Sequence, residues 1–144
     1  MVYNLSTSKK EFKNTADELL GSKPSFLSQF TIGNRKSPLM KIIDFHGTKW
    51  TFLNDERPLK GYIVLRPEGI VIRIITVKNS YAWVVPFYKL QIFKSNGLHL
   101  FADGSKISFQ SNKLSSRFKR FTAKLMLLKL EHESSRELMG SYDI

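Results

Sequence analysis

Cysteine is absent from the 144 residues of this sequence. Its absence excludes disulfide scaffolds, zinc sites built on thiolates and catalysis by a thiol nucleophile. Long apolar runs are missing as well, because the longest candidate, residues 70–77, contains Arg73 and is far shorter than the roughly 20 residues of a membrane-spanning helix. The first ten residues have no apolar stretch typical of a signal peptide. The sequence therefore predicts a soluble, cytoplasmic protein.

Motifs for catalysis and for cofactors are also missing. No histidine lies in the spacing of a zinc-binding motif; the histidines are His46, His99 and His132. The sequence contains neither a glycine-rich phosphate loop after a strand nor the GxSxG nucleophile elbow. Two carboxylate pairs, Asp55–Glu56 and Glu131/Glu133, fall in a predicted loop and at a predicted helix end, where solvated charge is the ordinary explanation. We therefore expect a protein that is not an enzyme and that has no cofactor and no metal.

Basic residues exceed acidic ones, with 23 Lys and Arg against 12 Asp and Glu, for a net charge of +11. Such an excess favours polyanionic partners, namely nucleic acid, anionic lipid headgroups or an acidic protein. The alternative is a basic surface that serves solubility alone. The length suits one domain covering residues 1–144.

The first part of the chain predicts a helix over residues 8–21. Ser8 followed by Glu11 matches a capping box, and Phe12 and Ala16 begin an apolar face. Residues 39–110 then show short runs separated by turn residues, among them the two-residue hairpin sequence Asp103–Gly104. We predict eight antiparallel strands, at 40–45, 49–53, 61–66, 70–77, 81–85, 89–93, 98–102 and 105–110.

A second helix is predicted over residues 115–132, with Ser115 as its N-cap. An apolar stripe repeats at spacings of four and three, and two further leucines widen it. The stripe is Leu114, Phe118, Phe121, Leu125 and Leu128, and the flanking leucines are Leu127 and Leu130. Residues 134–144 are predicted to be a tail. The fold class is therefore α+β and mostly β, a bent antiparallel sheet or barrel of seven to eight strands capped by a C-terminal amphipathic helix and preceded by an extra helix.

Two motifs add to this order of elements. The segment 61–65 with the turn 67–69 and Ile70 resembles the opening of the bacterial and GRAM-like branches of the pleckstrin-homology-like superfamily. The stretch 83–90, in which Pro86 separates two strands, resembles a later step of the same pattern. The resemblance covers about residues 39–132 and implies a bent sheet of seven strands closed at one corner by a C-terminal helix. The extra N-terminal helix and an eighth strand lie outside the pattern.

The predicted C-terminal helix also contains the main group of candidate site residues. Residues 113–130 contain six cations and no acidic residue. Four of them repeat at spacings of four, three and four, namely Lys113, Arg117, Arg120 and Lys124. Like charges at these separations and cations in a first helical turn both destabilise a helix, so an external anion is one explanation. The other is that Lys and Arg are good helix formers whose stems cover apolar surface.

The resemblance implies a further pair of candidates, because pleckstrin-homology domains hold phosphate groups with basic residues of the first strands and the loop between them. Lys41 and Lys49 flank the predicted first hairpin in the matching place. The sequence thus favours a binding module that engages an anionic membrane surface or a protein partner through a basic face, with the membrane periphery as a possible location. The alternatives are nucleic-acid binding by the basic helix with aromatics such as Tyr81 and Trp83, and a purely structural interaction module.

Overall fold

The computed structural model describes residues 2–21, 35–47, 50, 53, 56, 58–112 and 114–142, with side chains as far as residue 134. The described elements, in chain order, are β1 (Val2–Asn4), α1 (Lys9–Leu20), β2 (Met40–His46), β3 (Lys60–Arg66), β4 (Gly69–Ile75), β5 (Ser80–Pro86), the 3₁₀ turn η2 (Phe87–Lys89), β6 (Gln91–Lys94), β7 (Leu98–Ala102), β8 (Ser105–Phe109) and α3 (Ser116–Tyr142). The predicted class, α+β and mostly β, is confirmed.

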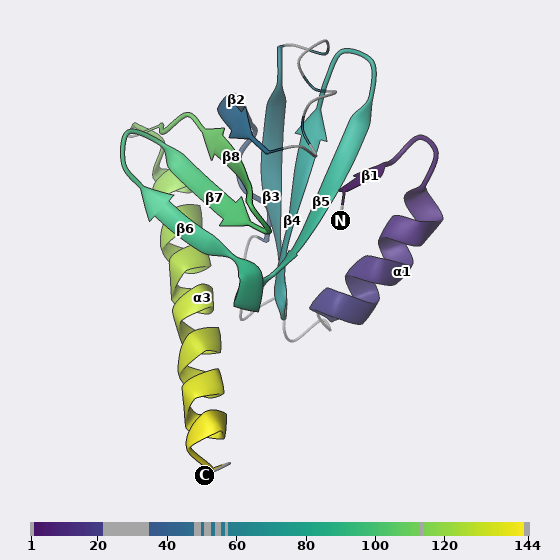
Figure 1. The fold of residues 1–144 in the computed structure, drawn as a ribbon. Coiled ribbons are helices and arrows are strands. Elements are labelled where there is room, and N and C mark those ends of the chain that lie inside the picture. The colour runs from purple at the N-terminus through teal and green to yellow at the C-terminus, as the bar shows by residue number, and fades with distance from the viewer. Residues whose placement is uncertain are drawn as a thin grey trace.

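Within these ranges the strands form one antiparallel sheet in the order β1-β5-β4-β3-β2-β8-β7-β6. The sheet does not close into a barrel, because β1 and β6 are its two edges. Strand β2 connects the two halves: Met40 and Lys41 pair with β3, whereas the residues from Ile42 onward pair with β8 after a shift in register between Ile42 and Asp44. Such an irregularity bends a strand, so the halves β3–β5 and β6–β8 fold toward each other (Figure 1).

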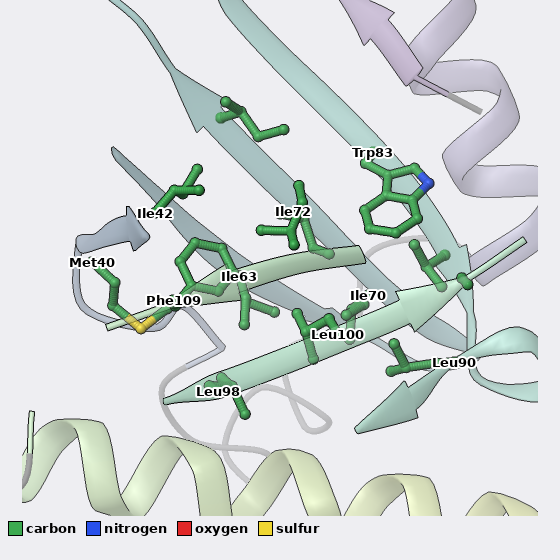
Figure 2. Packing of buried hydrophobic residues seen from close by; sticks show 14 of the residues in the cluster. Met40, Ile42, Ile63, Ile70, Ile72, Trp83, Leu90, Leu98, Leu100 and Phe109 are labelled. Carbon is green, nitrogen blue, oxygen red and sulfur yellow. The ribbon is translucent and has the colours of Figure 1, made fainter. Parts of the chain in front are cut away.

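The main core lies between these two halves. Figure 2 shows Ile63, Ile72 and Trp83 of one half directed toward Leu100 and Phe109 of the other, and all five are completely buried. Burying a large aliphatic or aromatic side chain stabilises a fold by about 1.5–3 kcal/mol. Buried and partly exposed residues alternate in β7, whereas β8 breaks the alternation because Ser108 is buried as well as Ile107 and Phe109. The Asp103–Gly104 turn has the positive φ angles, 51° and 74°, that a tight hairpin requires.

The N-terminal segment covers the opposite face of β4 and β5. Ala16 and Leu20 of α1 pack against Val71, Ala82 and Val84. This second layer explains why Val71 is buried as well as Ile70 and Ile72, since both faces of β4 are covered there. Strand β1, which pairs with β5 along the sheet edge, was not predicted from the sequence.

The start of α1 departs from the predicted capping box. The Ser8 side chain makes no capping hydrogen bond, and the Ser8 amide instead donates to the carbonyl oxygen of Asn4 at 2.8 Å. The helix itself spans Lys9–Leu20, which confirms the predicted range to within one residue at each end.

Of the strand predicted at 49–53, the structure describes Trp50 and Leu53, and neither lies in a strand. Trp50, Leu53 and Glu56 lie in 3₁₀ turns, and Trp50 and Leu53 are completely buried in the main core. Trp50 packs edge-on against Trp83, with ring centroids 4.9 Å apart. The three residues recur every third position, which is the period at which 3₁₀ side chains share a face, and not the period of two that a strand requires.

The predicted end of the second helix is also wrong. Helix α3 runs from Ser116 to Tyr142, so residues 134–142 are helical and not a tail. Of the predicted stripe, Phe118, Phe121 and Leu125 are buried and Leu128 packs beside them.

The remaining leucines of the stripe are exposed. Leu114 precedes the helix and is 99% exposed, while Leu127 and Leu130 are 55% and 59% exposed. These two lie outside the arc of about 100° that faces the core, so the buried stripe is narrower than predicted.

Candidate anion-binding surface at the start of the C-terminal helix

The first turns of α3 are fixed by a cap and by their apolar side. The Phe118 amide donates to the Ser115 Oγ at 3.1 Å, which confirms Ser115 as the N-cap. Phe118, Phe121 and Leu125 enter the core at spacings of three and four. Side chains three and four residues apart share a face of a helix. The buried side chains therefore fix the rotation of α3 about its axis, and with it the side on which the basic residues lie.

Three cations of α3 line one hollow together with a fourth from elsewhere in the chain. Arg117, Arg120 and Lys124 surround a hollow of about 300 Å³ with Lys36 and Phe121. We call this hollow the basic pocket. None of its described lining residues is acidic, so three of the predicted anion-binding residues are brought together without a carboxylate among them.

The sequence did not predict that Lys36 lies beside the C-terminal helix, and backbone pairing explains its position. Lys36 forms a bridge to Val64 of β3, the Leu65 amide donates to the Arg35 carbonyl oxygen at 2.8 Å, and the Ser37 amide donates to the Ile63 carbonyl oxygen at 2.9 Å. Its ammonium lies 5.9 Å from the centre of the Tyr62 ring. No local sequence motif indicates this pairing, because it joins segments more than 25 residues apart.

The other predicted site residues are dispersed. Lys41 lines another hollow of about 320 Å³, together with residues 38–40 and 110–112 and with Phe118. Lys49 and Lys113 lie outside the described residues. A third hollow, of about 550 Å³, adds two cations that the prediction did not include, Lys94 and Lys119.

The acidic residues pair elsewhere. Asp17 pairs with Arg66 at 2.6 Å and Asp44 with Lys106 at 2.9 Å; the Lys106 side chain, which donates a hydrogen bond to the Asp44 carboxylate, lowers the pKa of Asp44. Neither carboxylate belongs to the described lining of the three hollows. The beginning of α3 is therefore a concave surface with cations on its walls, which attracts anions.

Exposed apolar side chains stand beside this surface. Leu39, which lines the hollow of Lys41, is 57% exposed, and Leu114 is almost wholly exposed two residues after Asn112 of the same hollow. Peripheral membrane proteins combine such apolar side chains with neighbouring cations. In this protein the exposed apolar side chains beside the cations, Leu39 and Leu114, are aliphatic and not aromatic.

The aromatics that the sequence offered for base stacking are in the wrong place. Trp83 is completely buried and Tyr81 is 6% exposed, both on the inner face of β5. Phe118 and Phe121 are buried beneath the basic residues of α3. Stacking on bases requires exposed ring faces, so these rings do not supply it.

A separate polar cluster surrounds Glu56, for which a solvated position was expected. Glu56 is only 9% exposed and accepts hydrogen bonds from Tyr81 Oη at 2.7 Å, Asn79 Nδ2 at 2.9 Å and Thr76 Oγ1 at 3.1 Å. These hydrogen bonds lower the pKa of Glu56, and the bond from Asn79 makes the largest contribution. Burial, with the carboxylate beside it, raises the pKa of Tyr81 to about 12. We call this set the Glu56 cluster; it ties the 3₁₀ segment to the β4–β5 turn.

Two histidines connect neighbouring elements. The His99 ring lies 2.7 Å from both Ser108 Oγ and the Ser95 carbonyl oxygen, and the His132 ring packs on Phe87 at 5.6 Å. Within the described ranges, no three His, Asp or Glu side chains form a group suited to a metal ion. None of the described helices combines the length and the apolar character needed to cross a membrane.

No family model matches this chain, and comparisons with curated proteins and with solved structures find no match.

Proposed function

We propose that this protein is a non-enzymatic binding module that engages an anionic membrane surface through the start of α3. The observation that supports this most strongly is the basic pocket, where Lys36 joins Arg117, Arg120 and Lys124 around one hollow with no acidic residue among its described lining. Arg presents planar donors that bind two phosphate oxygens at once, and Lys adds a point charge. The exposed Leu39 and Leu114 beside the pocket supply apolar contact with the bilayer interface.

The energetics favour an external anion. Arg117, Arg120 and Lys124 lie three and four residues apart, where like charges destabilise a helix by a few tenths of a kcal/mol per pair. Attraction to an anionic membrane contributes about 1 kcal/mol for each Lys or Arg near the surface. The four pocket residues therefore support weak, salt-sensitive attachment. Peripheral attachment of a cytoplasmic protein is the localisation that this function implies.

The order of elements supports a pleckstrin-homology-like architecture within this proposal. Strands β2–β8 form a bent antiparallel sheet that α3 follows, as the resemblance implies. Helix α1 and strand β1 are additions to that pattern. The proposed site differs from the one implied by the resemblance, because it lies on α3 and Lys36 and not around the first hairpin.

The protein-partner alternative uses the same basic face, against an acidic protein surface. The nucleic-acid alternative is reduced to sequence-indifferent attraction to phosphates, because Phe118 and Phe121, the rings of α3 beneath the cations, are buried, as are Tyr81 and Trp83. One experiment distinguishes these alternatives from the membrane proposal.

The test is co-sedimentation with vesicles that contain phosphatidylserine, beside titrations with duplex and single-stranded DNA, each at low salt and at about 0.15 M salt. The wild-type chain is expected to sediment with anionic vesicles and not with neutral ones. The variant Arg117→Glu/Lys124→Glu is expected to stay in the supernatant, because it places two negative charges in the basic pocket.

Circular dichroism of the variant serves as the folding control. Binding to DNA but not to vesicles at about 0.15 M salt would overturn the membrane proposal in favour of nucleic acid. Binding to neither would leave the protein-partner alternative.

A further inference from the structure

Helix α3 has a second stripe on the side away from the core. The inner stripe is Phe118, Phe121, Leu125 and Leu128. The outer stripe repeats at spacings of four, three and four and consists of exposed residues only: Ala123, Leu127, Leu130 and Ser134. Two large leucines flanked by small residues form a surface on which another helix can pack closely.

The surroundings of the outer stripe extend its apolar area. A groove of about 580 Å³ separates β6 from α3, and Phe93 and Met126, 53% and 40% exposed, line it together with Leu127 and Leu130. Exposed apolar side chains gathered in one place mark interaction surfaces. In Figure 1, α3 lies on the far side of the sheet from α1, and its last turns extend past the strands.

The charge along α3 indicates which partner fits. No acidic residue precedes Glu131 in the helix, and Glu133 follows two residues later. The first turn contains no acidic residue, and the last turn contains no basic residue. A helix dipole favours acidic residues at the N-terminus and basic ones at the C-terminus. The first turn of α3 is the reverse of this, because it contains Arg117 and Lys119, and the last turn lacks the basic residues that the dipole favours. The dipole therefore does not stabilise the isolated helix through its charged residues. A second helix of the same sequence running in the opposite direction would set basic against acidic halves and oppose the two dipoles.

We propose that two copies of this chain pair through the outer stripes of their α3 helices, side by side and antiparallel. One register satisfies both the apolar and the charged residues. It sets Leu127 against the partner's Leu130. Lys124 and Glu131 lie on the same flank of the stripe, so this register also brings Lys124 beside the partner's Glu131. Glu131 is exposed. Because the contact is two-fold symmetric, every favourable pair occurs twice.

The apolar contact of this pairing is the outer stripe, which shares no residue with the basic pocket, whereas Lys124 belongs to both surfaces. Substitutions in the outer stripe therefore separate the pairing from the membrane proposal. Its test is sedimentation velocity of the full chain from about 5 to about 500 µM, because a dimer grows with concentration by mass action. The wild-type chain is expected to approach twice the mass of one chain over this range. Leu127→Glu/Leu130→Glu is expected to remain a monomer throughout.

The matched control is Val77→Glu/Leu19→Glu, which adds the same charge at two other exposed apolar positions and is expected to dimerise like the wild type. A charge exchange tests the register: Glu131→Lys alone is expected to weaken the dimer at least several-fold, and Lys124→Glu/Glu131→Lys to restore it. A wild-type chain that stays monomeric at the highest concentration overturns the proposal. So does a dimer that survives in the Leu127→Glu/Leu130→Glu variant.

Discussion

The Glu56 cluster and the basic pocket are both polar, yet they are built in opposite ways. In the Glu56 cluster one buried carboxylate accepts hydrogen bonds from Thr76, Asn79 and Tyr81, so its charge is satisfied within the chain. In the basic pocket four cations face one hollow, and no described lining residue is acidic. A buried charge that is fully hydrogen-bonded holds a fold together, whereas like charges gathered at a surface are stabilised by an external anion. The first cluster is therefore expected to govern stability and the second to govern binding.

The largest expected effect is on stability and comes from Glu56→Ala. This change leaves the buried hydroxyl of Tyr81 and the Asn79 amide without their acceptor, and unsatisfied partners of a charged group destabilise a fold by about 2–4 kcal/mol. Urea unfolding followed by circular dichroism measures the loss. The control is Glu131→Ala, an exposed carboxylate on α3 expected to change stability by less than about 0.5 kcal/mol. Equal losses in the two variants would contradict the assigned role of the Glu56 cluster.

Acid is expected to weaken the same cluster. The pKa of Glu56 is lowered in the folded chain from its ordinary value of 4.5, so the unfolded chain binds the proton more readily. The stability that Glu56 contributes is present above pH 4.5 and is lost as the pH falls below that value through the folded pKa. Urea unfolding of the wild type and of Glu56→Gln across this range is expected to show a steeper loss in the wild type. Parallel pH profiles would refute the contribution of Glu56.

A smaller effect is expected at the other end of the pH scale from Tyr81. Tyr81→Phe removes one hydrogen bond to Glu56 and is expected to cost about 1.5 kcal/mol at neutral pH. Because the pKa of Tyr81 is raised from 10.0 to about 12, its stabilising contribution is present below pH 10 and is lost as the pH rises toward 12. The difference in unfolding free energy between wild type and Tyr81→Phe should therefore shrink over that interval. A constant difference would show that the tyrosine does not titrate as described.

The smallest effect on stability is expected in the basic pocket. Arg120→Gln relieves repulsion with Arg117 and Lys124 and is expected to leave stability unchanged or to raise it by a few tenths of a kcal/mol. Urea unfolding at low salt, where screening is weakest, gives the most sensitive comparison. A loss of more than about 1 kcal/mol would mean that Arg120 has a structural partner, and the contrast between the two clusters would fail.

The sequence predicted those parts of the fold that depend on local patterns. The strands β3–β5, the Asp103–Gly104 turn and the Ser115 cap all follow from short periods and from single residues with strong conformational preferences. The spacing of Arg117, Arg120 and Lys124 likewise predicted three cations on one face of a helix.

The parts that failed depend on contacts between distant segments. Lys36 enters the basic pocket only because its segment pairs with β3, and Glu56 is buried only because Asn79 and Tyr81 meet it from β5 and the preceding turn. Trp50 and Leu53 were assigned to a strand because their run follows the turn residues 46–48, but their spacing of three suits the 3₁₀ turns that bury them. The continuation of α3 to Tyr142 was missed because the apolar stripe facing the core ends near Leu128.

The central claim is that the position of the cations, and not the total charge, directs the protein to an anionic membrane. Vesicle co-sedimentation of Arg117→Gln/Arg120→Gln beside Lys9→Gln/Lys10→Gln tests it directly, because both variants lose two positive charges and the second pair is exposed on α1, on the far side of the sheet (Figure 1). At about 1 kcal/mol for each residue near the surface, the first variant is expected to bind roughly thirtyfold more weakly than the wild type, and the second nearly as well as the wild type. Equal weakening of the two variants would contradict a site at the start of α3.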